Sequence, residues 1–164
     1  MKSLNECITE YRNQIAKGEI RIAYRGLIDF MIRLRNTIRD NYPSWPAAGN
    51  LYQGYMDMTY FPLSTDKLKD KKLKIAVVLI HDTLRFEIWL SAVNKNIQSE
   101  YWDKLKGKDL KGYRMPSVLK GSDSIIEYTL ENNPDFGDPD SLIRQLVTGT
   151  VRFINDVEVL ISEI

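Results

Sequence analysis

Six side chains suited to ligand binding or proton transfer lie in two short stretches of this sequence. They are Tyr55, Asp57, His81, Arg85, Glu87 and Trp89. Two carboxylates that are crowded together can raise the pKa of one of them far enough for acid–base catalysis. A guanidinium and two aromatic rings would line a pocket for a small polar or peptide-like ligand. His81 precedes Asp82, whose carboxylate would orient the imidazole.

Whether these side chains meet depends on how residues 51–61 fold. The period of two in this segment is typical of a half-buried strand. We predict that its odd-numbered side chains share the non-core face of a sheet with Arg85, Glu87 and Trp89. These odd-numbered residues are Gln53, Tyr55, Asp57 and Thr59, whereas Met56 and Met58 are expected to face the core.

The next two segments, residues 73–81 and 84–93, predict a β-hairpin. The first is almost wholly apolar and rich in β-branched residues, which is typical of a central strand. The second alternates between apolar and polar side chains. A two-residue loop places Val77 opposite Ile88 and pairs apolar side chains along one whole face. A shift of one residue would mix the two faces, so the register is well defined.

Two helices are predicted before the strands. Ser3 and Glu6 have the spacing of a capping box, and Gly18 is a natural end for the helix that follows. A second, longer helix continues until shortly before Pro43, because the residue that precedes a proline disfavours the α conformation. We expect the two helices to pack as an antiparallel pair.

Further elements follow the hairpin. A helix is expected to begin near Asn94, and a short one to run from Ser122 or Asp123 to about residue 132. Residues 113–119 are extended and form at most an edge strand, because Pro116 excludes a helix interior. The last helix begins at Asp138 and Pro139, an N-cap aspartate followed by a proline at the first helical position.

These elements together predict an α+β fold. We expect an antiparallel sheet of three to four strands, packed with the N-terminal helix pair and the C-terminal helices. The strands are expected at about residues 51–61, 73–81 and 84–93, with a fourth at 113–119. A chain of 164 residues fits one domain, residues 1–164.

The chain lacks the short motifs of several enzyme classes. It contains neither the glycine-rich loops of nucleotide-binding proteins nor the nucleophile elbow of hydrolases. Its single histidine excludes a multi-histidine metal site. We interpret Cys7 as a buried structural residue, and the aspartates at 135, 138 and 140 as turn and capping residues rather than calcium ligands. No cofactor or metal is therefore predicted.

The two carboxylates Asp57 and Glu87 leave one enzymatic alternative open. Together they would serve a metal-assisted hydrolase, as in nucleases that place an acid on one strand and Glu-x-Lys on the next. Trp89 stands where that motif requires a lysine, so the motif is broken.

Charge is unevenly distributed along the chain. Lysines gather in two clusters, at residues 67–74 and 104–111, whereas residues 122–164 carry nine acids and only two arginines. We interpret the lysine clusters as solvated loops and sheet-edge protection. A nucleic-acid surface is the alternative that we favour less.

The location of the protein can also be predicted. The start of the chain shows no apolar signal segment, and the longest apolar run, residues 75–80, is too short to span a membrane. With one cysteine, the chain depends on no internal disulfide, which fits a reducing compartment. We therefore expect a cytoplasmic protein without membrane contact.

Three segments carry a resemblance to a known family. They are residues 51–61 (LYQGYMDMTYF), 84–90 (LRFEIWL) and 133–136 (NPDF). In these segments the chain resembles an uncharacterised family of bacterial and archaeal domains of unknown function, along nearly its whole length. The resemblance implies a small prokaryotic protein and supplies no activity, cofactor or catalytic residue. Our leading hypothesis is a non-catalytic domain that binds a small ligand or another protein and forms a homodimer.

Overall fold

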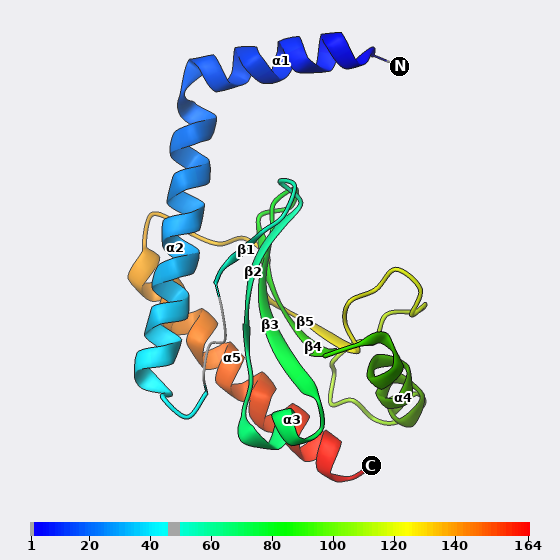
Figure 1. Ribbon diagram of the computed structural model, residues 1–164. Helices are drawn as coiled ribbons and strands as arrows, with labels where there is room; N and C mark the ends of the chain where they lie inside the picture. Colours follow the sequence, from blue (N-terminus) through cyan, green and yellow to red (C-terminus); the bar gives the residue numbers. More distant parts are fainter. Residues whose placement is uncertain (1, 46–49) are drawn as a thin grey trace.

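The computed structural model describes residues 2–45 and 50–164 (Figure 1). Its helices and strands follow one another along the chain in the order α1, α2, β1, β2, α3, β3, β4, α4, β5 and α5. The helices are α1 (Leu4–Lys17), α2 (Glu19–Asn41), α3 (Asp66–Asp70), α4 (Lys95–Leu105) and α5 (Pro139–Ser162). The strands are β1 (Tyr52–Gln53), β2 (Met58–Leu63), β3 (Leu73–Ile80), β4 (Arg85–Ala92) and β5 (Ile126–Glu131).

The five strands form one antiparallel sheet in the order β1-β2-β3-β4-β5. This confirms the α+β class, with one strand more than the sequence predicts. The register of the β3–β4 hairpin is also confirmed, since Val77 pairs with Ile88 and Leu79 with Phe86. The apolar side chains of β4 and the odd-numbered apolar side chains of β3 therefore share one face, which we call the core face.

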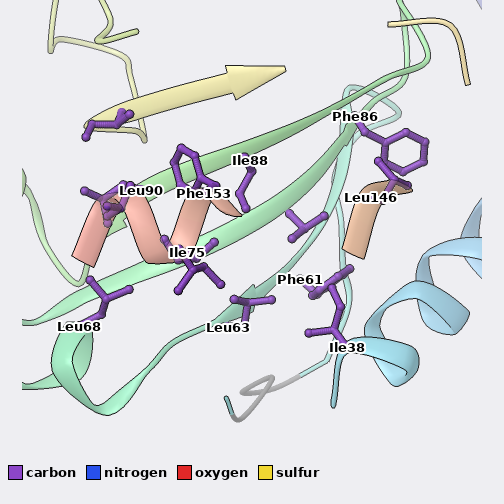
Figure 2. Close-up of a cluster of buried hydrophobic side chains, with 14 of the residues drawn as sticks. Ile38, Phe61, Leu63, Leu68, Ile75, Phe86, Ile88, Leu90, Leu146 and Phe153 are labelled. Carbon is purple, nitrogen blue, oxygen red and sulfur yellow. The ribbon is translucent and has the colours of Figure 1, made fainter. Parts of the chain in front are cut away.

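The core face is covered by α2 and α5 (Figure 1). Met31, Leu34 and Ile38 on α2 are fully buried, as expected for a stripe with steps of three and four. Figure 2 shows Phe153 of α5 among side chains that project from the sheet. Burial of these apolar surfaces is the main stabilising contribution to the fold, at about 25 cal/mol per Å².

The helix ends follow the chemistry of the sequence. Ser3 and Glu6 make the predicted capping box, in which the Glu6 backbone N–H donates to Ser3 Oγ at 3.3 Å. Asp138 caps α5 by accepting from the Ser141 backbone N–H at 3.1 Å, directly before Pro139. The predicted starts of α1 and α5 are therefore confirmed.

Two predicted elements are wrong. Residues 122–132 do not form a helix, because Ile126, Tyr128 and Leu130 alternate with polar residues, and the chain pairs with β4 as strand β5. Residues 113–119 form no strand, and Arg114 makes only a single bridge, to Glu127.

The N-terminal helices also differ from expectation. They do not pack as an antiparallel pair, because α1 turns away from α2 at Gly18 and extends from the body of the protein (Figure 1). Gly18 has a φ of 89°, a left-handed conformation that glycine adopts at no steric cost. Cys7 lies on α1 and is exposed rather than buried.

The side chains of β2 face the opposite way from the prediction. Thr59, Phe61 and Leu63 lie on the core face, whereas Met58 and Tyr60 lie on the other side, which we call the outer face. The two bulky apolar residues at odd positions, Phe61 and Leu63, determine this choice, because both are fully or almost fully buried. A bend at residues 54–57 also separates β1 from β2.

Candidate ligand-binding site

Three of the predicted site residues come together on the outer face of β4. Glu87 is only 3% exposed, and its carboxylate accepts from Arg85 Nε at 2.6 Å and from Trp89 Nε1 at 2.7 Å. Alternation along a strand places residues i, i+2 and i+4 on one face, which is why these three side chains meet. Because both carboxylate oxygens have a donor, Glu87 fixes the positions of Arg85 and Trp89.

The other three predicted residues lie elsewhere, where the β1–β2 and β3–β4 turns meet. Tyr55 is 97% exposed in the β1–β2 bend. Asp57 accepts from the Met58 backbone N–H at 2.8 Å, and its own carbonyl accepts from the His81 backbone N–H at 2.9 Å. Asp57 and His81 are therefore neighbours, but they do not join the Arg85–Glu87–Trp89 group.

The separation of Asp57 from Glu87 bears on the hydrolase alternative. Tyr60 pairs with Val78, which pairs with Glu87, so two strand spacings separate Tyr60 from Glu87. Asp57 lies three residues before Tyr60 in the chain. Strand geometry then puts Asp57 and Glu87 more than about 10 Å apart. The two carboxylates cannot share a metal ion or a water molecule at that distance.

His81 is held by contacts from two other elements. Its Nε2 lies 2.8 Å from Oγ1 of Thr59, which is fully buried, and its ring centroid lies 5.7 Å from that of Tyr24 on α2. Burial lowers the pKa of His81 below the ordinary value of 6.5, although the negative charge of Asp57 opposes this shift. The folded protein therefore favours the neutral imidazole.

This shift predicts a dependence of stability on pH. Below the ordinary pKa the unfolded chain binds a proton at His81 that the folded chain takes up less readily, so the free energy of unfolding falls as the pH falls. In His81→Gln, which does not titrate, this part of the loss should disappear. Urea unfolding of both proteins at about pH 7.5 and about pH 5.5 measures the difference. Equal losses in the two proteins would contradict the prediction.

A pocket of about 270 Å³ opens on the outer face beside Trp89. It lies between the sheet, the N-terminal end of α4 and the segment around residue 123. Its lining consists of Met58, Tyr60, Lys74, Ala76, Trp89, Ser91, Ala92, Val93, Asn94, Lys95, Gln98 and Asp123.

The pocket combines a small residue with two large aromatic ones. Ala76 pairs with Trp89 across β3 and β4, and its methyl group leaves space that a larger side chain would fill. Tyr60 contributes a ring and a hydroxyl group. Burial, with smaller effects of Tyr52 and Asp123, raises the pKa of Tyr60, so its hydroxyl remains a neutral donor at neutral pH.

The far wall of the pocket is the chain at residues 122–124, which side chains of β4 and α4 hold in place. Ser91 Oγ donates to the Asp123 carbonyl at 2.7 Å. Gln98 Nε2 donates to the carbonyls of Ser122 and Ser124, each at 2.9 Å. Ser91 and Gln98 are both buried, so these bonds make the wall a fixed part of the structure.

The charged groups around the pocket leave a positive excess. Lys95 Nζ lies 3.1 Å from Asp123 Oδ1, so these two charges are paired. Lys74 makes no ion pair with any residue in the described ranges, 2–45 and 50–164. Asn94 caps α4 at the same edge, and the partial positive charge of this helix end adds to that of Lys74.

Of the residues that line this pocket, the sequence pointed to Trp89 but not to Tyr60, Lys74 or Lys95. Tyr60 lies on the same face of β2 as Met58, which the sequence predicted to face the core. The sequence signal that places Tyr60 on the outer face is the pair Phe61 and Leu63. These two apolar residues at odd positions face the helices, so the even-numbered residues face the other way.

The lysine clusters are partly neutralised by nearby groups. Lys67 pairs with Glu158, Lys69 with Asp66, and Lys104 with Glu100. Lys106 Nζ lies 4.8 Å from the centre of the Trp102 ring. These contacts support the interpretation as solvated surfaces and give no support to the nucleic-acid alternative, which stays a prediction.

Within residues 2–45 and 50–164, no three His, Cys, Asp or Glu side chains lie close enough together to hold a metal ion. In the same part of the chain, no helix combines the length and the apolar character needed to cross a membrane.

Comparison with known proteins places the chain in a family. Residues 4–161 match the sequence profile of a family described as a domain of unknown function. This agrees with the resemblance found in the sequence. No curated protein and no solved structure is significantly similar to this chain.

Proposed function

Because the chain belongs to DUF7000, a family of domains of unknown function, we propose its function from the pocket on the outer face alone. The domain binds a small organic anion there, without catalysing a reaction. The ligand carries a flat or apolar part that packs on Trp89 and Tyr60. Its acidic group, a carboxylate or a phosphate, lies next to Lys74.

The observation that carries this proposal is the unpaired Lys74 at the rim of a pocket with aromatic walls. A cation that lacks a partner within the described residues, next to the N-terminal end of a helix, favours an anion. The volume of about 270 Å³ restricts the ligand to a small molecule. Lys95 is already paired with Asp123, so it contributes to the shape of the rim more than to its charge.

The chemistry of Glu87 supports binding rather than catalysis. Its two oxygen atoms accept from Arg85 and Trp89, and it is almost fully buried. A general base needs a lone pair directed at the proton that it removes. In this arrangement Glu87 instead holds Trp89 in position as one wall of the pocket.

A panel of small carboxylates and phosphates tests the proposal by thermal shift and then by calorimetry. A ligand at about 100 times its Kd should stabilise the wild-type protein by about 2.7 kcal/mol. Lys74→Ala should weaken binding about tenfold or more, because it removes the only unpaired cation among the described lining residues. The matched control is Lys120→Ala, an exposed lysine outside the pocket, which should bind as the wild type does.

Two outcomes would reject the proposal. One is that no acid in the panel stabilises the wild-type protein. The other is that Lys74→Ala and Lys120→Ala bind with equal affinity. Binding of a neutral ligand that is insensitive to Lys74 would also place the site elsewhere.

We also infer a cytoplasmic location. The single cysteine, Cys7, is exposed on α1, where an oxidising compartment would favour disulfides between chains. A reducing compartment avoids that reaction. The inference is tested by separating the compartments of cells that produce the protein and locating it with an antibody.

A further inference from the structure

Gln98, near the start of α4, holds the far wall of the outer-face pocket with only one end of its amide group. Its Nε2 donates to the carbonyls of Ser122 and Ser124, each at 2.9 Å. Carbonyl oxygens only accept hydrogen bonds, so these two bonds fix which end of the amide faces the wall. The Oε1 atom is the other end of the same group, and it therefore points away from residues 122–124.

The Oε1 atom of Gln98 is a free acceptor at the surface of the pocket. It accepts no hydrogen bond from any residue within 2–45 and 50–164. In the same ranges, the side-chain atoms that are both unpaired and sealed from solvent are Asn36 Oδ1 and Thr150 Oγ1. Oε1 of Gln98 is not one of them, so part of its surface is open. Because Gln98 is only 3% exposed and lines the pocket, that open surface faces the pocket.

A free acceptor in a buried wall restricts the ligands that can fill the pocket. Such a ligand excludes water from Oε1, and an oxygen that loses its water without gaining a donor weakens binding. A ligand with an N–H or O–H group at this point restores the hydrogen bond, whereas one with a C–H group does not. The pocket therefore distinguishes two ligands that differ only in this group.

This acceptor lies close to the lysine that binds the acid group. Lys74 pairs with Ser91 across β3 and β4, and the Cα atoms of such a pair are about 5 Å apart. Ser91 Oγ donates to the Asp123 carbonyl, which lies in the chain between the two carbonyls that Gln98 holds. Ser91 is thus a neighbour of both Lys74 and Gln98. A ligand that contacts both of them carries its donor within a few bonds of its acid group.

The charge of the pocket decides which donor is favoured. Its charged lining residues are Lys74, Lys95 and Asp123, so the net charge is 2 − 1 = +1. Lys95 and Asp123 pair with each other, which leaves the charge of Lys74. An anion balances this charge, whereas a ligand that also carries an ammonium group is neutral overall and does not. A hydroxyl group is therefore a better donor to Gln98 Oε1 than an ammonium group.

We propose that the ligand is a small hydroxycarboxylic acid with an aromatic side group and a hydroxyl group on the carbon next to the carboxylate. The carboxylate lies at Lys74, the ring packs on Trp89 and Tyr60, and the hydroxyl group donates to Oε1 of Gln98. This inference rests on the proposed function, which supplies the acid and the ring. It adds the hydroxyl group, with Gln98 as the residue that recognises it.

Calorimetry on the wild-type chain with matched ligands tests the proposal. The ligands are the two enantiomers of phenyllactate, phenylpropanoate, which lacks only the hydroxyl group, and phenylalanine, which has an ammonium group in its place. We expect one enantiomer of phenyllactate to bind about tenfold or more tightly than phenylpropanoate, because only the hydroxy acid satisfies Oε1. Phenylalanine should bind more weakly than that enantiomer, because it does not balance the charge of Lys74.

Two variants assign this discrimination to Gln98. Gln98→Met has a side chain of similar length without an amide oxygen, so it should bind phenyllactate and phenylpropanoate with equal affinity. The matched control is Ser91→Ala, which also removes a bond to the wall but keeps Oε1, so it should prefer phenyllactate as the wild type does. A looser wall weakens both ligands alike in either variant, so the ratio of the two affinities reports on the acceptor alone.

The outcomes separate this inference from the proposed function. If phenyllactate and phenylpropanoate bind wild type equally, and Lys74→Ala weakens both, the pocket binds anions but the role of Gln98 is overturned. If neither binds while another acid of the panel does, this inference alone fails, and if no acid binds, both fail. A preference for phenyllactate that persists in Gln98→Met, or tighter binding of phenylalanine than of either enantiomer, would also overturn it.

Discussion

Replacement of Phe153 by alanine is expected to lower the free energy of unfolding by about 3–5 kcal/mol. Phe153 is fully buried, and its ring lies 5.0 Å from that of Tyr113, centre to centre. In Figure 2 it stands among Ile75, Ile88 and Leu90 of the central strands. Removing the ring loses its burial and leaves a cavity between α5 and the sheet, which the surrounding side chains would only partly fill.

Urea unfolding followed by circular dichroism measures this loss. Val159→Ala is the control on the same helix, because Val159 is 43% exposed and its truncation should change stability by less than about 0.5 kcal/mol. If Phe153→Ala cost less than about 1 kcal/mol, α5 would not pack on the core face as described.

The second large effect is expected at Glu87. Its replacement by alanine leaves the Trp89 indole N–H and the Arg85 guanidinium without their acceptor. A hydrogen bond to a charged group contributes about 1.5–3 kcal/mol. Because the side chain of Arg85 is 40% exposed and can regain water, we expect a total loss of about 2–3 kcal/mol rather than the sum of two such bonds.

Ligand affinity should change as well, because Glu87 fixes the ring of Trp89. Glu87→Ala should therefore weaken both folding and binding, and Glu87→Gln, whose amide oxygen still accepts one of the two bonds, should weaken both less. Glu100→Ala is the surface control: its ion pair with Lys104 is exposed and should contribute less than about 1 kcal/mol. A Glu87→Ala protein as stable as Glu100→Ala would refute the role of Glu87 as an internal acceptor.

The hairpin of β3 and β4 was predictable from the sequence because many residue pairs specify the same register. Every apolar residue on one face of β3 meets an apolar residue of β4, so only one register satisfies all of them. The starts of α1 and α5 were also predictable, because their signals are local. Side chains such as Ser3 and Asp138 bond to the backbone of their own helix, so the signal lies within a few residues.

The errors arose where the outcome depends on distant parts of the chain. Residues 126–131 begin after a plausible helix cap, yet they pair with β4, whose edge has no other partner in the sheet order. The face of β2 was decided by burial of Phe61 and Leu63 under the helices, and a local pattern of alternation cannot tell inside from outside.

In the candidate site, too, the local grouping could be predicted from the sequence and the contacts between distant segments could not. Arg85, Glu87 and Trp89 could be grouped from one strand, because alternation alone brings them together. The pocket beside them needs Lys74 from β3, the start of α4 and the segment at Asp123, three regions that only the folded chain places together.

The fixed wall at residues 122–124 has a consequence for the diversity of the family. Ser91 and Gln98 hold this wall through three main-chain carbonyl groups, which every amino acid possesses. The side chain of Asp123, which lines the pocket, can therefore be exchanged while the anchoring bonds persist. We expect related proteins to differ in ligand preference mainly through this short stretch, on a scaffold that stays the same.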